Sequence, residues 1–392
     1  MNFSLCLSVL FLLLCTCQPC SWSKNIIVPT ETDTIQKAVE MAVSGDTILL
    51  ASPVVNWGTQ VVVEGKDLVI KGNLRNHHTW VICDDLPLTV GCPSPRQPLL
   101  QIQNSNIVLQ NFYLTKPGMY KMVCGYDHYT PSIIQVDSGS LTVENCEIHC
   151  SLVTSADVTI QNSQYYAYSL NERYFVYPVG SETLPAIQIE NASNITVLIQ
   201  RSLIVSEYYE GIHFQNVQDA QVDIKDSIIR SGRRTNFRFG SIQEGEDGMY
   251  LENCDTVQIN LYDSVVNAGD SGPERGTGPV GPYEPGGNGI YVKDSNVLIS
   301  GGVVMGGKGY DGDVSYSWLV HDYDASDGGH GMVLENSTVR IEDVILIPGK
   351  GGKEDEKEGY RKVEAGQPGL PVVLDENSRV IEVTEVGDWS IY

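Results

Sequence analysis

The stretch Gly248-Met249-Tyr250-Leu251-Glu252-Asn253 decides the fold, because it is one copy of a repeated unit. Three more copies show the same pattern of a glycine, a short apolar strand and an Asn or Asp. They are Gly211-Ile212-His213-Phe214-Gln215-Asn216, Gly289-Ile290-Tyr291-Val292-Lys293-Asp294 and Gly331-Met332-Val333-Leu334-Glu335-Asn336. Repetition at a nearly constant spacing indicates an array of stacked units rather than a single globular core.

Two further apolar strands follow each copy, for example Val222-Asp223-Ile224 and Ser227-Ile228-Ile229 in the first unit. Three short strands separated by turns are typical of one coil of a three-sided solenoid, in which every second side chain enters the core. An Asn or Asp between strands tolerates the left-handed backbone of a corner, and stacked copies can form a side-chain ladder. Parallel crossovers are right-handed. The sequence therefore predicts an all-β, right-handed, single-stranded parallel β-helix.

The N-terminal part of the mature chain predicts a cap for this stack. Asp33 with Gln36 three residues later is a helix start signal. One helical face is apolar and comprises Ile35, Ala38, Val39 and Ala42. A helix here would cover the open end of the stack, where unpaired edges invite aggregation. We expect residues 24–98 to form the cap and first coils, and residues 99–392 to form repeat coils with long loops on one side.

The same region resembles a known superfamily. Thr34-Ile35-Gln36-Lys37-Ala38-Val39, followed by Ser44-Gly45-Asp46-Thr47-Ile48, looks like the opening of the pectate-lyase-like β-helix proteins. Leu68-Val69-Ile70-Lys71-Gly72 and then Trp80-Val81-Ile82 resemble their next coil. The resemblance covers nearly all of the mature chain. It implies the fold and no single activity, because the superfamily includes lyases, hydrolases, epimerases, esterases, phage spikes and adhesins.

The first 23 residues predict a signal peptide. Leu5 to Leu14 is an apolar run too short to span a bilayer comfortably, and Ser21 and Ser23 suggest cleavage before Lys24. A lipoprotein is the alternative, because cysteines follow the apolar run at Cys15, Cys17 and Cys20. No later stretch is long and apolar enough to be a transmembrane segment. We expect a secreted protein, extracellular or at the cell surface.

The overall charge restricts the partners. There are 25 Lys and Arg against 49 Asp and Glu, a formal net charge of -24. This balance argues against nucleic acid, because phosphate binding needs a cationic surface. It is compatible with divalent cations, since these prefer carboxylate oxygens.

The cysteines and sequons fit an exported protein. Six cysteines remain after residue 23, and an even count in an exported protein predicts disulfides. Six cysteines allow about 15 pairings, and the sequence alone does not choose among them. Cys83–Cys92 and Cys146–Cys150 are the short local loops that we expect. N-glycosylation sequons occur at Asn191, Asn194 and Asn336.

Long insertions follow the third strand of successive units, at 230–247, 267–288, 305–330 and 348–369. Because they leave at the same corner, we expect them to stack into a wall on one side. Long loops on a rigid scaffold are where binding and catalysis usually occur. The alternative is that they are spacer loops without a function.

A basic cluster lies in the first insertion. Arg233 and Arg234 are candidate catalytic residues, and Arg230 and Arg238 are candidate substrate-binding residues. Arginine pairs with carboxylates, so an acidic polysaccharide would suit the cluster. In β-elimination a cation neutralises the uronate carboxylate while a base removes the adjacent proton. The alternative is a surface loop whose arginines pair with neighbouring acids.

Carboxylates from successive coils form a second candidate site. Asp247 and Asp270 could serve as paired carboxylates for glycoside hydrolysis. Calcium is the cofactor that clustered acids would bind, as in several lyases of the resembling superfamily. Its candidate ligands are Glu244, Glu246, Asp311 and Asp313. The alternative is a set of solvated acidic loops.

Gly329-His330-Gly331 resembles the Gly-His-Gly of polygalacturonases, in which the histidine assists the catalytic carboxylates. Three departures weaken the match. Ser271 stands where a second aspartate is expected, the gap from Asp270 to His330 is too long, and no Arg-Ile-Lys follows. A simpler interpretation is that His330 fills the loop-exit position that Asn288 fills one unit earlier.

Aromatic residues near the insertions could stack on sugar rings, namely Tyr208, Tyr209, Tyr310 and Trp318. Loop packing is the alternative for them. The predicted function is binding of an extracellular acidic polysaccharide and, in its stronger form, lyase-like or hydrolase-like cleavage. The alternative is a non-catalytic structural, surface or adhesin-type protein, because no complete catalytic signature occurs.

Overall fold

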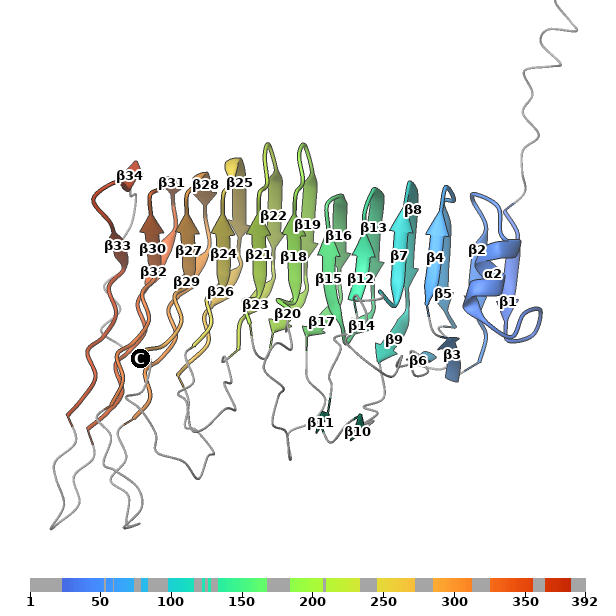
Figure 1. Cartoon of the computed structure of the whole chain (residues 1–392), viewed down its shortest axis with the longest axis horizontal. Coiled ribbons are helices and arrows are strands. Elements are labelled where there is room, and N and C mark those ends of the chain that lie inside the picture. The colour runs from blue at the N-terminus through green and yellow to red at the C-terminus, as the bar shows by residue number, and fades with distance from the viewer. Residues whose placement is uncertain are drawn as a thin grey trace, which may run out of the picture.

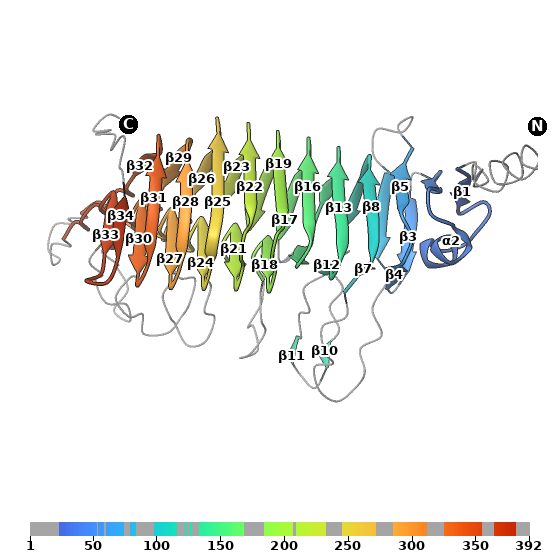
Figure 2. The ribbon, with the colours of Figure 1, turned by 90° about the horizontal axis from the view of Figure 1, so that it is seen from above.

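The computed structural model describes residues 23–52, 54–58, 60–73, 79–83, 98–115, 122–123, 126–127, 133–167, 184–206, 209–232, 245–271, 285–311, 325–354 and 364–381. These residues form a stack of coils in which each coil contributes one strand to each of three parallel sheets (Figures 1 and 2). The predicted right-handed, three-sided parallel β-helix is confirmed.

The first sheet contains the strands that open each coil. In spatial order they are β4 (Val61–Glu64), β7 (Leu100–Gln103), β12 (Ile133–Val136), β15 (Ser151–Thr154), β18 (Ile187–Glu190), β21 (Ile212–Gln215), β24 (Met249–Glu252), β27 (Ile290–Lys293), β30 (Met332–Glu335) and β33 (Val372–Leu374).

The second sheet follows across a short corner. Its strands are β1 (Asn25–Val28), β2 (Thr47–Leu50), β5 (Leu68–Gly72), β8 (Ser105–Gln110), β13 (Gly139–Glu144), β16 (Asp157–Gln161), β19 (Thr196–Gln200), β22 (Gln221–Lys225), β25 (Asp255–Tyr262), β28 (Asn296–Ser300), β31 (Thr338–Glu342) and β34 (Arg379–Ile381).

The third sheet completes each coil, and the insertions leave after it. Its strands are β3 (Val54–Gly58), β6 (Thr79–Cys83), β9 (Phe112–Thr115), β14 (Glu147–Ile148), β17 (Gln164–Ala167), β20 (Leu203–Ser206), β23 (Ile228–Arg230), β26 (Val265–Asn267), β29 (Val303–Met305) and β32 (Ile345–Ile347). A separate antiparallel pair is formed by β10 (Met122–Val123) and β11 (Tyr126–Asp127).

The core consists of the inward half of each strand. Leu251 of β24 lies between Phe214 of β21 and Val292 of β27, and all three are fully buried. Burial of one such side chain contributes roughly 1.5–3 kcal/mol. Because the register places equivalent residues above one another, each coil needs its neighbours to bury its apolar face.

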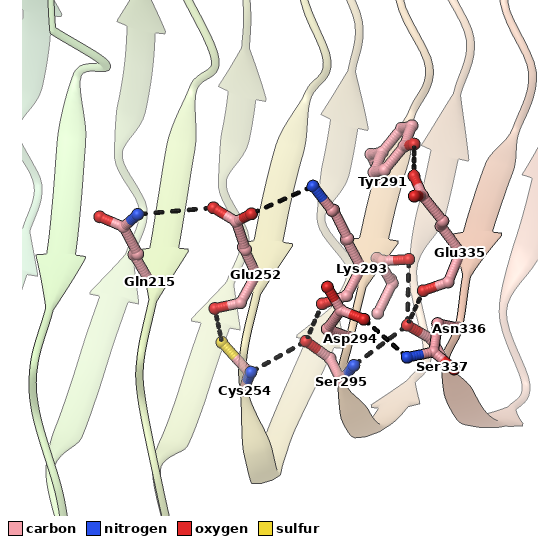
Figure 3. A network of polar contacts seen from close by, with 11 residues as sticks. Gln215, Glu252, Cys254, Tyr291, Lys293, Asp294, Ser295, Glu335, Asn336 and Ser337 are labelled. Atoms are coloured by element: carbon pink, nitrogen blue, oxygen red, sulfur yellow. Dashed lines mark hydrogen bonds and ion pairs between the residues drawn. The ribbon is translucent and has the colours of Figure 1, made fainter.

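The corners use the residue types that the sequence predicts. Asn216, Asn253, Asp294 and Asn336 follow four successive first-sheet strands and have φ between 49° and 54°. Asn336 also donates its side-chain amide to Asp294 Oδ1 at 2.7 Å (Figure 3). This contact belongs to the predicted side-chain ladder, which tolerates left-handed backbone and links coils together.

Buried serines form a second ladder beside these corners. The Cys254 amide donates to Ser295 Oγ at 2.9 Å, and the Ser295 amide donates to Ser337 Oγ at 3.1 Å (Figure 3). The corner between the second and third sheets has the same arrangement, because the Ser227 amide donates to Ser264 Oγ at 3.1 Å. Each hydroxyl therefore satisfies a backbone amide that would otherwise be buried without a partner.

The predicted capping helix is present as α2 (Ile35–Met41) and covers the N-terminal end of the stack (Figure 1). All four residues of its predicted apolar face are buried. The predicted start is wrong by one residue, because Thr34 and not Asp33 is the N-cap and accepts from the Lys37 amide at 3.3 Å. Gln36 instead accepts from the Val62 amide at 2.9 Å, which ties the helix to β4.

The expected Cys146–Cys150 disulfide is wrong, because both residues are free and buried, as is Cys254. Cys146 Sγ donates to Glu144 O at 3.3 Å, whereas Cys150 Sγ lies 3.6 Å from Tyr165 Oη. Burial raises the pKa of each of the two thiols to about 12. Cys92, and with it the expected Cys83–Cys92 pair, lies outside the described residues.

No helix within the described ranges is long and apolar enough to span a membrane. The predicted signal peptide, 1–23, lies almost entirely outside these ranges, since the description begins at Ser23.

Candidate functional site

The four long insertions are described at their bases, which lie at one edge of the stack (Figure 1). Each base has an outgoing limb that follows the third sheet and a returning limb that leads into the first sheet. The outgoing limbs are 231–232, 268–271, 306–311 and 348–354, and the returning limbs are 245–248, 285–289, 325–331 and 364–371.

A ladder of backbone hydrogen bonds joins these limbs, and we call it the glycine ladder. The ladder alternates between outgoing and returning limbs. Its members, in order, are Gly269, Gly287, Gly307, Gly329, Gly349 and Gly369. The amide of each glycine after Gly269 donates to the carbonyl of the glycine before it in this order, and the Gly269 amide donates to Glu246 O, all at 2.7–2.9 Å. Space is the reason for glycine here, because a Cβ on Gly269 would lie 1.6 Å from Gly232 O. Gly349 and Gly352, like Gly366 and Gly369, share the three-residue spacing of a polyproline II helix.

Asp247, Asn288 and His330 occupy the same position in successive coils, directly before the repeat glycine. Asp247 Oδ1 accepts from the Asn288 amide at 2.8 Å, and Asn288 Oδ1 accepts from the His330 amide at 3.1 Å. His330 Nδ1 in turn accepts from the Leu370 amide at 2.9 Å. The predicted catalytic residues Asp247 and His330 therefore link one coil to the next.

The His330 contact fixes its protonation state. Because Nδ1 accepts a hydrogen bond, the imidazole is neutral and carries its proton on Nε2. Burial lowers the pKa of His330, and the negative charge of Asp327 raises it by a smaller amount.

Two further predicted carboxylates, Asp270 and Asp311, also accept a hydrogen bond from a backbone amide of a later coil. Asp270 Oδ1 accepts from the Lys308 amide at 2.8 Å, and Asp311 Oδ1 accepts from the Lys353 amide at 2.8 Å. Asp311 also pairs with Lys308 Nζ at 2.9 Å. The hydrogen bond from the Lys353 amide lowers the pKa of Asp311 most, and the hydrogen bond from the Lys308 side chain lowers it by a smaller amount. Within the described ranges, no three His, Cys, Asp or Glu side chains gather closely enough to hold a metal ion.

The remaining predicted site residues do not gather in one place. Arg230 is exposed on the third sheet, Tyr209 lies just after β20, and Glu246 is buried in the first returning limb. Tyr310 lies in the third outgoing limb, where its amide donates to Ser326 Oγ at 2.6 Å. The others lie outside the described residues: Arg233, Arg234, Arg238, Tyr208, Trp318, Glu244 and Asp313.

A different set of polar residues gathers on the outer face of the first sheet. His213 of β21, Tyr250 of β24 and Tyr291 of β27 are in register on successive coils. The ring centroids of His213 and Tyr250 are 4.8 Å apart, and those of Tyr250 and Tyr291 are stacked at 5.3 Å. These three rings form a row along the helix axis, directly beside the returning limbs.

Carboxylates surround this row. Tyr291 Oη donates to Glu335 Oε2 at 2.6 Å, and Lys293 Nζ lies 3.3 Å from Glu252 Oε1 (Figure 3). At the other end, Glu210 Oε2 lies 3.8 Å from His213 Nδ1. We call this set the first-sheet cluster: Glu210, His213, Asp247, Tyr250, Glu252, Tyr291, Lys293 and Glu335.

Tyr250 is at the centre of the first-sheet cluster. Burial, followed by the negative charges of Glu252, Asp247 and Glu210, raises its pKa to about 12. Burial and the hydrogen bond to Glu335 raise the pKa of Tyr291 as well. Both phenols therefore remain protonated at neutral pH and can donate hydrogen bonds.

The sequence pattern that predicted the strands also contained this row. His213, Tyr250 and Tyr291 are the third residues of three aligned repeat units. Alternation places the second and fourth residues of each unit in the core and sends the third outward. The sequence does not distinguish this row from ordinary outward strand positions, although aromatic and titratable residues at the same outward position of adjacent repeats are a usable signal.

No family model and no curated protein matches the chain. Among solved structures, the chain is similar to polygalacturonase from Erwinia carotovora ssp. carotovora, with 12% identity, coverage of 93% of this chain and 95% of that chain, and a TM-score of 0.36. It is also similar to the A-module of the mannuronan C-5 epimerase AlgE4 from Azotobacter vinelandii, with 10% identity, coverage of 88% and 94%, and a TM-score of 0.33.

A third similar structure is the alginate lyase AlyF-OU02, with 12% identity, coverage of 94% of this chain and 86% of that chain, and a TM-score of 0.31. The likeness concerns the fold. The three parallel sheets of the chain are those of a parallel β-helix.

Proposed function

We propose that this chain binds an extracellular polysaccharide on the outer face of the first sheet and cleaves it there. One observation supports this most strongly: His213, Tyr250 and Tyr291 form a continuous row in register across three coils. A row that crosses coils suits an extended polymer, because each further coil presents one more side chain at a strand spacing of about 4.8 Å.

The chemistry of the row suits sugars. Tyrosine offers an apolar ring together with a hydroxyl, and carboxylates accept hydrogen bonds from sugar hydroxyls. Both hydroxyls are protonated at neutral pH; that of Tyr291 already donates to Glu335 Oε2, whereas that of Tyr250 can donate to a sugar. Pockets for small polar ligands combine apolar surface with a few such convergent polar groups.

Export, glycosylation and calcium are separate parts of the proposal. N-terminal sequencing of the secreted protein should start at Lys24, and mass measurement before and after deglycosylation tests the sequons. Calcium would use Glu244, Glu246, Asp311 and Asp313, although Asp311 already pairs with Lys308. Isothermal titration calorimetry with calcium tests that part directly.

A non-catalytic surface protein is the alternative function, and one observation favours it. Members of the first-sheet cluster bind one another, as in the pairs Tyr291–Glu335 and Lys293–Glu252 (Figure 3). Contacts of this kind between adjacent strands stabilise a sheet without any ligand.

The test is a binding panel of neutral and acidic polysaccharides with the full-length protein. Tyr250→Ala should weaken binding at least tenfold. Tyr262→Ala is the matched control, because Tyr262 is an exposed tyrosine on the second sheet and should leave affinity unchanged. Absence of binding to every polymer, or an equal loss in both variants, would contradict the proposal.

A further inference from the structure

We propose that Glu210 and His213 are the proton-transfer pair of this site, and that the reaction is hydrolysis of an uncharged polysaccharide. This inference rests on the proposed function and specifies its substrate class, its reaction and two of its residues. It differs from the elimination reaction that the arginine cluster suggests from sequence alone.

The first observation is that the pair has two buried atoms without partners. Glu210 Oε2 and His213 Nε2 are buried, and neither makes a hydrogen bond within the part of the chain that the structure describes. Buried polar side-chain atoms nearly always have a partner, so an exception invites a functional explanation. Two such atoms lie on adjacent side chains beside a row of rings, and a polar group of a ligand would satisfy them once these side chains shift to admit it.

The second observation concerns which nitrogen is available. His213 Nδ1 faces Glu210 Oε2 at 3.8 Å, so the carboxylate favours the tautomer with a proton on Nδ1. Nε2 then carries the lone pair and can accept a proton. Glu210 would stabilise the imidazolium that forms, and contacts of this length commonly shorten when substrate binds.

The position of the pair in the fold supports a site at this point. Only residues 207–211 connect β20 to β21, whereas the preceding connection spans 168–186 and the following one spans 231–248. Glu210 and His213 therefore lie at a short connection between two long insertions. Tyr250, the next member of the row, contacts the His213 ring at 4.8 Å.

The charges of the first-sheet cluster indicate the substrate class. Lys293 is the single cation among the outward residues of β21, β24, β27 and β30 that the structure describes, and it pairs with Glu252. Glu210, Asp247 and Glu335 bring the count of carboxylates to four. Their field disfavours a uronate anion and stabilises positive charge. Glycoside hydrolysis passes through an oxocarbenium-like transition state, which carries such a charge.

The protons of the proposed reaction pass between water, His213 and Tyr250, and no cofactor is required. Water gives a proton to His213 Nε2 while its oxygen bonds to the anomeric carbon. The bond from that carbon to the glycosidic oxygen breaks, and this oxygen takes a proton from Tyr250 Oη. His213 then returns its proton to the phenolate of Tyr250, so one water is consumed for each linkage cleaved. Tyr250 is protonated beforehand, because the pKa of a phenol lies well above neutral pH.

The test measures new reducing ends and unsaturated uronates on neutral and acidic polymers with the full-length protein. We expect reducing ends from a neutral polymer and no unsaturated product. His213→Gln should lower kcat at least 100-fold, a larger change than the accompanying weakening of binding. Glu210→Gln should lower kcat about tenfold and leave KM within threefold, because the imidazolium formed in the reaction loses its carboxylate.

His149→Gln is the matched control. His149 also lies beside a glutamate, 2.9 Å from Glu147, but on the third sheet, so kcat should be unchanged. Circular dichroism and the unfolding midpoint show whether each variant folds, and Glu210→Gln carries the test should His213→Gln fail to fold.

The outcomes separate the two proposals. Binding without reducing ends, unsaturated products, or a His213→Gln rate within threefold of the parent would each overturn the inference and leave the binding site intact. Absence of binding to every polymer overturns the proposed function and the inference with it.

Discussion

Substitution of Gly269 by alanine tests how the insertions are held together. The added Cβ would lie 1.6 Å from Gly232 O, whereas ordinary contact begins near 3.4 Å, so the two limbs must separate by about 2 Å. Gly269 donates to Glu246 O at 2.8 Å and accepts from the Gly287 amide at 2.9 Å, and the separation breaks both bonds. The backbone of Gly269 itself is compatible with alanine, so the cost is steric.

The magnitude follows from these contacts. Overpacking costs about 1–3 kcal/mol, and each lost hydrogen bond costs about 1 kcal/mol. We therefore expect Gly269→Ala to lower the free energy of unfolding by about 4 kcal/mol. Gly45→Ala is the control, because no atom lies within 4 Å of its Cβ position and only its φ of +92° is unfavourable. That strain costs about 1–2 kcal/mol.

The assay is urea unfolding followed by circular dichroism, together with hydrogen exchange at the amides of Gly287 and Gly307. Stacked repeats can unfold locally, so exchange at the limbs reports the effect even where the global transition does not. Gly269→Ala should accelerate exchange at both amides. A variant no less stable than Gly45→Ala, with unchanged exchange, would refute the account of the glycine ladder.

Three further predictions concern the coils and their corners. Ser264→Ala should cost about 1–3 kcal/mol in urea unfolding, because the buried Ser227 amide loses its acceptor, and an equal loss in Ser300→Ala would contradict this. Stability should fall as the pH drops below about 6.5, because the folded state binds a proton at His330 less readily than the unfolded chain does. The pH dependence of the unfolding midpoint should flatten in His330→Gln, and an unchanged slope would refute the contribution. A thiol reagent should label the folded protein slowly and the unfolded protein fully at the buried cysteines Cys146, Cys150 and Cys254, whereas rapid labelling before unfolding would contradict their burial.

The fold could be predicted because its causes are local and repeated. The alternation of apolar and polar residues within each unit predicts its strands. Corners with positive φ favour Asn or Asp, as at Asn253 and Asn336. The helix start was wrong by one residue because Asp33 and Thr34 are both good N-cap residues. Which of them caps the helix depends on the contact of Gln36 with Val62, which joins distant parts of the chain.

The candidate site could be predicted less well, because it depends on what each side chain does in three dimensions. Asp247, Asp270 and His330 look catalytic in sequence, yet each accepts a backbone amide of a later coil. The Cys146–Cys150 pairing followed from their proximity in sequence, whereas the coil directs the two thiols to different partners. His213 and Tyr250 occupy strand positions, where the pattern explains their spacing without any function.

The most direct test of the polysaccharide site is hydroxyl-radical footprinting of the full-length protein, with and without a bound oligosaccharide, read by mass spectrometry. Binding on the outer face of the first sheet predicts reduced oxidation at His213, Tyr250 and Tyr291. Tyr262 on the second sheet and Tyr166 on the third should be oxidised equally in both samples. Protection at Tyr166 or Tyr262 with no change at His213 and Tyr250 would place the ligand elsewhere and contradict the proposed site.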